Sequence, residues 1–133
     1  KTNAVRDSSK KETLRRALVG RMNGSKHLLL IIGNTTKNDT DWVPFEIRYA
    51  VENCKIPIIV AYTGYEKIMD PVALSGLWPY ELAKAVANKQ VGIIHIPFKK
   101  EPISDAIFQF DVNNHPKTTL NYYSQEAYNL WGL

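Results

Sequence analysis

Three apolar runs divide the chain, and none of them alternates with polar positions. They cover residues 27–32, 57–62 and 91–97. A continuous run of this length, rich in β-branched residues and bounded by turn residues, is typical of a strand covered on both faces, and such strands are usually parallel. We therefore predict three strands of one parallel sheet.

Segments with helical spacing separate the three runs. The apolar positions on their inner faces are Val43, Ile47, Ala50, Val51 and Cys54 within residues 41–54, and Leu82, Ala85 and Val86 within residues 77–88. Apolar residues at three- and four-residue steps form one stripe of a helix. The alternation of strand and helix predicts an α/β fold, a three-layer flavodoxin-like parallel sheet with helices on both faces and right-handed crossovers.

Further helices are predicted at both ends of the chain. Ser9 to Glu12 has the pattern of a capping box, so a helix should begin at Ser9 and end near Asn23. Its apolar stripe would consist of Leu14, Ala17, Leu18 and Met22. After the third strand we predict a short helix over residues 104–113, carrying Ile107, Phe108 and Phe110, and another over residues 124–130. The aromatic residues Tyr122, Tyr123, Tyr128 and Trp131 are expected to anchor that last helix.

A length of 133 residues fits one domain, residues 1–133. Three strands make a narrow sheet, and a doubly wound fold normally starts with its central strand. This chain starts instead with a loop and a helix. We therefore expect an amino-terminal strand and helix to be missing from the domain.

The composition limits which cellular compartment and which kinds of partner are expected. Cys54 is the only cysteine, so no intramolecular disulfide can form, and a cytoplasmic location is expected. No apolar run approaches the roughly 20 residues needed to span a bilayer, so no membrane partner is expected. Residues 1–26 hold eight basic against two acidic side chains, and the remainder holds nine against eleven. Such a basic helix can contact nucleic acid, but a solvated outer face is the commoner reason, so nucleic acid is not the expected partner.

Ligands of open parallel sheets bind beyond the carboxyl ends of the strands. The loop after the first strand is therefore a candidate binding site. Residues 33–40 are polar, and Asn34, Thr35 and Thr36 are its candidate ligand-binding residues. The helix that starts at Asp41 would offer free N–H groups to an anion such as a pyrophosphate. The alternative is that asparagine, threonine and aspartate serve here only as turn and cap residues.

Glu46 is the candidate catalytic residue. Trp42 lies four positions before it and Tyr49 three positions after it, so a carboxylate and two rings share one edge of the helix. A carboxylate flanked by rings loses solvation, which raises its pKa, and it can bind a sugar diol or stabilise a developing cation. The alternative is a solvent-facing glutamate in an ion pair beside a tryptophan used for packing.

The histidines are weaker candidates. His95 lies in the middle of a strand and is expected to be a core residue, whereas His27 and His115 lie at element edges without evident partners. No spacing typical of a metal site occurs, and no glycine-rich phosphate loop of a standard pattern is present.

One stretch resembles a known family. Residues 28–36, the element Trp42-Val43-x-x-Glu46-Ile47 and residues 58–60 resemble the middle of a TIR-like domain, in particular the bacterial TIR-like group (DUF1863) that includes the signalling subunit of Thoeris anti-phage systems. The resemblance extends from Arg6 to Tyr128. It implies that Glu46 is the catalytic residue of an NAD-cleaving enzyme, with Trp42 either structural or lining the pocket.

The resemblance also implies the partners. NAD would be the substrate and no metal would be needed, while water would give ADP-ribose and an internal nucleophile a cyclic product. TIR-type domains generally act as assemblies, so a homo-oligomer and a downstream effector activated by the nucleotide signal are expected. The alternative from a different functional class is a non-catalytic signalling adaptor that acts by self-association.

Overall fold

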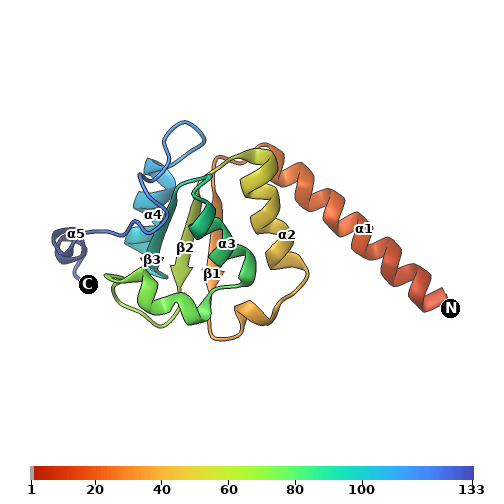
Figure 1. Ribbon diagram of the computed structural model, residues 1–133, viewed down its shortest axis with the longest axis horizontal. Coiled ribbons are helices and arrows are strands. Elements are labelled where there is room, and N and C mark those ends of the chain that lie inside the picture. Colours follow the sequence, from red (N-terminus) through yellow and green to blue (C-terminus); the bar gives the residue numbers. More distant parts are fainter. Residues whose placement is uncertain (1) are drawn as a thin grey trace.

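A computed structural model describes residues 2–133, with side chains from Lys10 onward, and shows a three-stranded parallel sheet (Figure 1). Its strands are β1 (Leu28–Ile32), β2 (Ile58–Tyr62) and β3 (Ile93–Pro97), which lie side by side in that order. The three predicted strands are confirmed, each within a residue or two of its apolar run.

The helices alternate with the strands. They are α1 (Thr2–Asn23), α2 (Trp42–Arg48), α3 (Tyr80–Asn88), α4 (Lys100–Gln109) and α5 (Gln125–Leu130). Helix α2 continues without a break into a π-helical turn, Tyr49–Cys54, so the two together cover the predicted helix over residues 41–54. Short 3₁₀ segments occur at Thr36–Asn38 and Pro71–Leu77. The helix predicted over residues 77–88 begins later, at Tyr80, because Trp78 and Pro79 have extended backbone.

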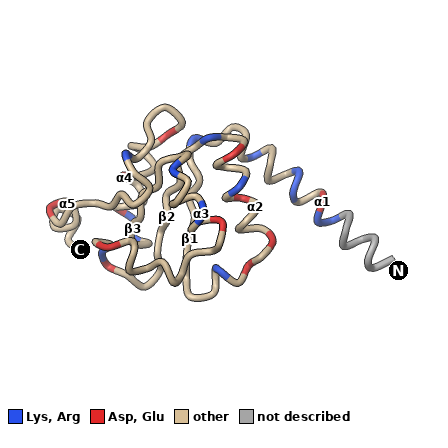
Figure 2. Tube along the Cα trace, in the orientation of Figure 1, with Lys and Arg blue, Asp and Glu red and all other residues tan. Residues whose placement is uncertain are grey.

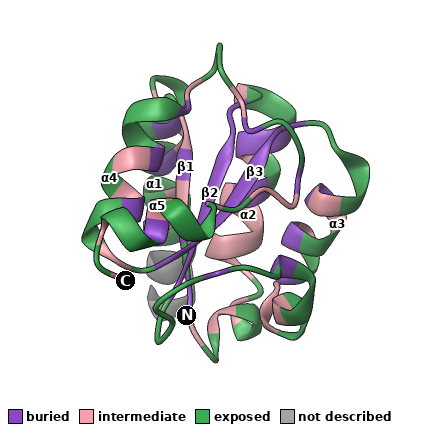
Figure 3. Cartoon of the chain, turned by 90° about the vertical axis from the view of Figure 1, so that its left-hand side faces the viewer, coloured by how far each residue is buried: buried purple, intermediate pink, exposed green. Residues whose placement is uncertain are grey.

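Two apolar layers lie on opposite faces of the sheet. One layer packs the inner faces of α1, α2 and α3 against the strands, and the other packs α4 against β2 and β3. Figure 3 shows α3 and α4 on opposite sides of the buried strands. The three-layer α/β architecture with helices on both faces is thus confirmed.

Strand β1 departs from the prediction because only one of its faces is fully covered. Leu28, Leu30 and Ile32 are buried under the helices, whereas Ile31, on the opposite face, is 45% exposed. The reason is the position of β1 at the edge of the sheet, since α4 packs mainly over β2 and β3.

The predicted start of α1 is wrong. The helix begins at Thr2, so Ser9 lies inside it, where its backbone N–H already has an intrahelical acceptor and a capping box has no role. The predicted apolar stripe is correct only at its carboxyl end. Leu18 and Met22 are buried, but Leu14 is 53% exposed because the amino-terminal half of α1 projects away from the sheet (Figure 1). Ala17, next to the buried Leu18, is also exposed.

The helix predicted over residues 104–113 is shifted. Helix α4 starts at Lys100, with Pro102 in its first turn, where the missing N–H of proline costs nothing. Its buried positions include Ala106, and Phe110 lies just beyond its end, whereas Phe108 is 92% exposed. The apolar pattern therefore identified a helix but misplaced its inner face.

The aromatic anchor at the end of the chain is confirmed. Tyr123, Tyr128 and Trp131 form edge-to-face pairs with ring centroids 5.1 to 6.4 Å apart. The buried Tyr128 hydroxyl donates to Ile68 O at 3.1 Å and accepts from Ile68 N at 3.3 Å. Helix α5 is therefore tied to the loop after β2, while Tyr122 remains 45% exposed.

Candidate functional site

The loop after β1 lies at the carboxyl edge of the sheet. The Gly33 N–H donates to the Thr36 hydroxyl oxygen at 2.9 Å, which closes a tight turn into the 3₁₀ segment. Asn34 and Thr35 are exposed, and their side chains form no hydrogen bond with residues 10–133. Of the three candidate ligand-binding residues in this loop, Thr36 is therefore used by the turn, and the other two remain free for a ligand.

The start of α2 is not open to an anion as the sequence suggested. One Asp39 carboxylate oxygen accepts the N–H groups of Asp41 at 2.8 Å and Trp42 at 3.0 Å. The Asp41 carboxylate pairs with Lys11 Nζ at 2.7 Å and with Arg15 at 3.6 Å. Since carboxylates already occupy this helix start, the predicted pyrophosphate position there is wrong.

Three half-buried rings of α2 and the turn after it form a row that we call the aromatic row, Trp42, Phe45 and Tyr49. The Arg15 guanidinium lies 5.8 Å from the Trp42 ring centroid and 5.3 Å from that of Phe45, a cation–π geometry. The rings of Phe45 and Tyr49 stack at 5.9 Å, and the Tyr49 hydroxyl donates to Asn23 Oδ1 at 2.7 Å. The row is thus held between α1 and the core.

Glu46 lies beside this row and is half-buried. Burial raises the pKa of its carboxyl group above the ordinary value of 4.5; Arg21 acts against that shift, and Asp39 adds to it. The structure thus brings Glu46, Trp42 and Tyr49 onto one side of α2, as the spacing predicted. It gives Glu46 no ion pair among residues 10–133.

Sequence reasoning missed the basic residues that complete this region. Arg15 and Arg21 both come from α1, and Figure 2 shows the basic residues distributed along that helix, including its end beside α2. The sequence features that could have indicated them are the excess of positive charge in residues 1–26 and the two aspartates before the next helix, Asp39 and Asp41. The pattern did not show which of the eight basic side chains would meet them.

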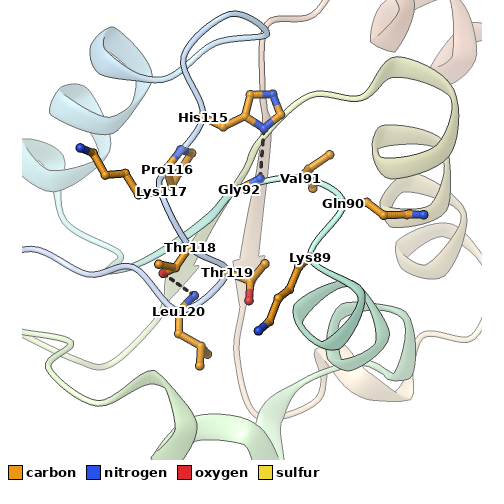
Figure 4. A pocket seen from close by; sticks show the side chains of 10 residues that line it. All are labelled: Lys89, Gln90, Val91, Gly92, His115, Pro116, Lys117, Thr118, Thr119 and Leu120. Carbon is orange, nitrogen blue, oxygen red and sulfur yellow. Dashed lines mark hydrogen bonds between the residues drawn. The ribbon is translucent and has the colours of Figure 1, made fainter.

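A cavity of about 500 Å³ lies at the other end of the sheet, at the amino-terminal end of β3 (Figure 4). Two segments line it, residues 89–92 and residues 115–120. Glu46 lines neither this cavity nor the smaller hollows beside Gln90. The sequence reasoning did not find this site, because its residues belong to two loops that come together only in the fold.

His95 is fully buried, as predicted, and belongs to a chain of hydrogen bonds. Its Nδ1 lies 2.7 Å from the Tyr62 hydroxyl, its Nε2 lies 3.0 Å from Thr119 O, and Trp78 Nε1 donates to the Tyr62 oxygen at 2.9 Å. Burial lowers the pKa of His95 to about 4, although the hydrogen bond to Thr119 opposes the shift. His95 is therefore a neutral core residue.

The other two histidines have partners, contrary to the prediction. His27 Nδ1 lies 3.2 Å from Phe110 O, and His115 Nδ1 accepts the Gly92 N–H at 3.0 Å. Both contacts join segments far apart in the sequence, so spacing alone could not reveal them. No group of three or more potential metal ligands occurs among the described residues, and no helix in that part of the chain is long and apolar enough to cross a membrane.

Comparison with known proteins identifies the family. Neither the curated proteins nor the solved structures include a match. The sequence model described as "Thoeris protein ThsB, TIR-like domain" matches residues 1–68, just over half of the chain, including the β1 loop, the aromatic row and Glu46. The chain therefore belongs to the family of TIR-like domains of Thoeris protein ThsB.

Proposed function

We propose that this TIR-like domain cleaves NAD⁺ to release nicotinamide and form an ADP-ribose-type signal, cyclic or linear, in anti-phage defence. The observation that carries the proposal is the half-buried Glu46 carboxylate, whose pKa is raised by burial beside the aromatic row. Perturbed carboxylates of this kind are concentrated at functional sites. Family membership adds support because the matched segment contains this residue.

Cleavage of the nicotinamide–ribose bond mainly requires the protein to hold a negative charge close to the ribose. The bond between ribose C1′ and the nicotinamide nitrogen breaks, its electron pair neutralises the pyridinium ring, and positive charge develops on the ribose. An ionised Glu46 carboxylate near that ribose stabilises the oxocarbenium-like transition state electrostatically. The cation is then captured by water or by a nucleophile within the same molecule.

The candidate binding residues take different parts in this proposal. Asn34 and Thr35 lie at the carboxyl edge of the sheet, form no side-chain hydrogen bond within residues 10–133, and are available to hydrogen-bond the substrate. Trp42 and Tyr49 are engaged with Arg15 and Asn23, so their part is to exclude water from Glu46. Thr36 shapes the loop through its bond to Gly33.

The test is to incubate the protein with NAD⁺ and to follow free nicotinamide by chromatography. Glu46→Gln should reduce the rate by at least about 100-fold, the scale on which one electrostatic group acts in catalysis. Glu52→Gln is the matched control, since Glu52 lies on the turn that continues α2 and is exposed, and it should retain the wild-type rate. Equal rates for wild type and Glu46→Gln would remove the proposed role of Glu46.

The proposal extends to an assembly that signals in the cytoplasm through a downstream effector. The second candidate function is a non-catalytic adaptor that self-associates, and the apolar surface of α4 favours it. Phe108 is 92% exposed and Ile107 is 41% exposed, and exposed apolar patches often mark interfaces. If a Phe108→Ser variant dissociates an oligomer seen by light scattering, and wild type releases no nicotinamide, the adaptor function is favoured.

A further inference from the structure

The cavity at the amino-terminal end of β3 is separate from the Glu46 region. It lies where β3 begins, whereas Glu46 belongs to the helix that follows the carboxyl end of β1. Its volume of about 500 Å³ falls within the usual range of small-molecule sites, about 300–1,000 Å³. The cavity is therefore large enough for a small organic ligand.

Backbone contacts fix the shape of this cavity. A Cβ atom on Gly92 would lie 2.8 Å from Pro116 N and would also overlap the Pro116 carbonyl oxygen, so the two segments can approach only at a glycine. The Gly92 N–H donates to His115 Nδ1 at 3.0 Å (Figure 4). Since Nδ1 accepts, the neutral imidazole carries its proton on Nε2. The two walls of the cavity are thus held together independently of any ligand.

The lining carries positive charge without a counter-ion. Lys89 and Lys117 are among its ten residues, and none of the ten is acidic. Neither ammonium group has an ion pair or hydrogen bond within residues 10–133. Helix α3 ends here, and a helix carboxyl end carries roughly half a negative charge, which two lysines outweigh. The electrostatics therefore favour an anion.

Two buried backbone donors at the cavity lack an acceptor. Val91 and Thr119 are 4% and 5% exposed, and the structure gives their amide N–H groups no acceptor among residues 10–133. The Thr119 hydroxyl donates to Val86 O at 2.8 Å and is not the acceptor of either amide N–H group. Buried backbone donors are nearly always paired in proteins. Ligand oxygen atoms would supply the missing acceptors.

We propose that this cavity binds a small organic phosphate, at a site distinct from the one around Glu46. A phosphate group combines a charge close to −2 with three acceptor oxygens. It can therefore accept hydrogen bonds from the two backbone donors, and the positive charge of the lining lysines favours its binding. The remaining volume of the cavity accommodates the organic part of the ligand.

The test is a titration of the full chain with AMP, and separately with adenosine, at low salt and followed by amide NMR. AMP should bind, the Val91 and Thr119 amide signals should shift, and adenosine should bind at least about tenfold more weakly because it lacks the phosphate. The double variant Lys89→Gln with Lys117→Gln should weaken AMP binding by at least about tenfold. Lys67→Gln removes an exposed lysine elsewhere that has no ion pair within residues 10–133, and it should change binding by less than about twofold.

The proposal is overturned if AMP does not bind at millimolar concentration, or if Lys67→Gln weakens binding as much as the double variant does. Shifts confined to the loop after β1 would also overturn it, because they would place AMP at the other end of the sheet. Glu46→Gln should leave AMP binding unchanged. The inference therefore stands or fails separately from NAD⁺ cleavage.

Discussion

Acidification should destabilise this fold through His95. Thr119 O can only accept a hydrogen bond, so His95 Nε2 carries the ring proton, and Nδ1 must accept from the Tyr62 hydroxyl. The Tyr62 oxygen in turn accepts from Trp78 Nε1, which completes a fully paired chain inside the core. A second proton on His95 would break this pairing and place a charge on a ring that is fully buried.

The size and sign of the effect follow from the two pKa values. Burial lowers the pKa of His95 from 6.5 to about 4. Between these pH values the unfolded chain binds a proton that the native chain does not, so the free energy of unfolding falls as the pH falls. The loss is about 2 kcal/mol near pH 5 and about 3 kcal/mol once the pH is below 4. The contribution is fully present above the unfolded pKa, at neutral pH.

Urea denaturation between about pH 5 and pH 7.5, followed by tryptophan fluorescence, measures this loss. A His95→Gln variant does not titrate, and its amide can still donate to Thr119 O, so its stability should vary less with pH by about 2 kcal/mol across the range. If His95→Gln and wild type lose the same stability on acidification, the buried neutral histidine is not the cause.

Three further predictions test other parts of the structure. Arg21→Gln removes the charge that favours ionised Glu46, so the acid limb of nicotinamide release should move to higher pH than in wild type. Gly92→Ala should destabilise the fold by about 2 kcal/mol or more through overlap with the neighbouring loop, whereas Gly20→Ala, in an open helical position, should stabilise it by up to about 1 kcal/mol in the same thermal melt. Tyr128→Phe should cost about 1–3 kcal/mol and speed hydrogen exchange in the loop after β2, because a buried backbone N–H and C=O lose their partner.

The order of strands and helices could be predicted because each element carries its own hydrophobic period. Strands β2 and β3 are continuous apolar runs, and all five residues of each are buried. The helix after β1 was predicted almost to the residue, since Ile47, Ala50 and Val51 do form its buried face. These elements could be predicted because the local hydrophobic pattern indicates both the type of element and its buried face.

The errors lie where tertiary position overrides local pattern. Leu14 and Phe108 have the right spacing for a core but lie on helices that cover the sheet only in part. An argument from helical spacing assumes that the whole helix packs against another surface. The spacing does not show how much of the helix does so. The exposed face of β1 was missed for the same reason, because a continuous apolar run has the same sequence pattern in a central strand and in an edge strand.

The two candidate sites differ in how far the sequence could reveal them. Glu46 and its rings occupy one helix and the turn after it, so helical spacing was enough to group them, and the family match covers that segment. The phosphate cavity joins Lys89 to Lys117 across the whole of β3 and α4, with no motif in either loop. Contacts of that range are set by chain topology, so they become visible only in three dimensions.

Three basic residues of α1 interact within the molecule, which weighs against a nucleic-acid function for these three. Lys11 and Arg15 neutralise Asp41, which immediately precedes α2, and Arg15 also covers the rings of that helix. Burial raises the pKa of the Glu46 carboxyl group, and the positive charge of Arg21 lowers it. A carboxylate that must stabilise a cation needs both effects, because burial strengthens its field and a nearby positive charge keeps it ionised. Residues engaged in this way are poorly placed to neutralise a phosphate backbone, and the presence of these three basic residues is better explained by their interactions with α2 and the residues before it.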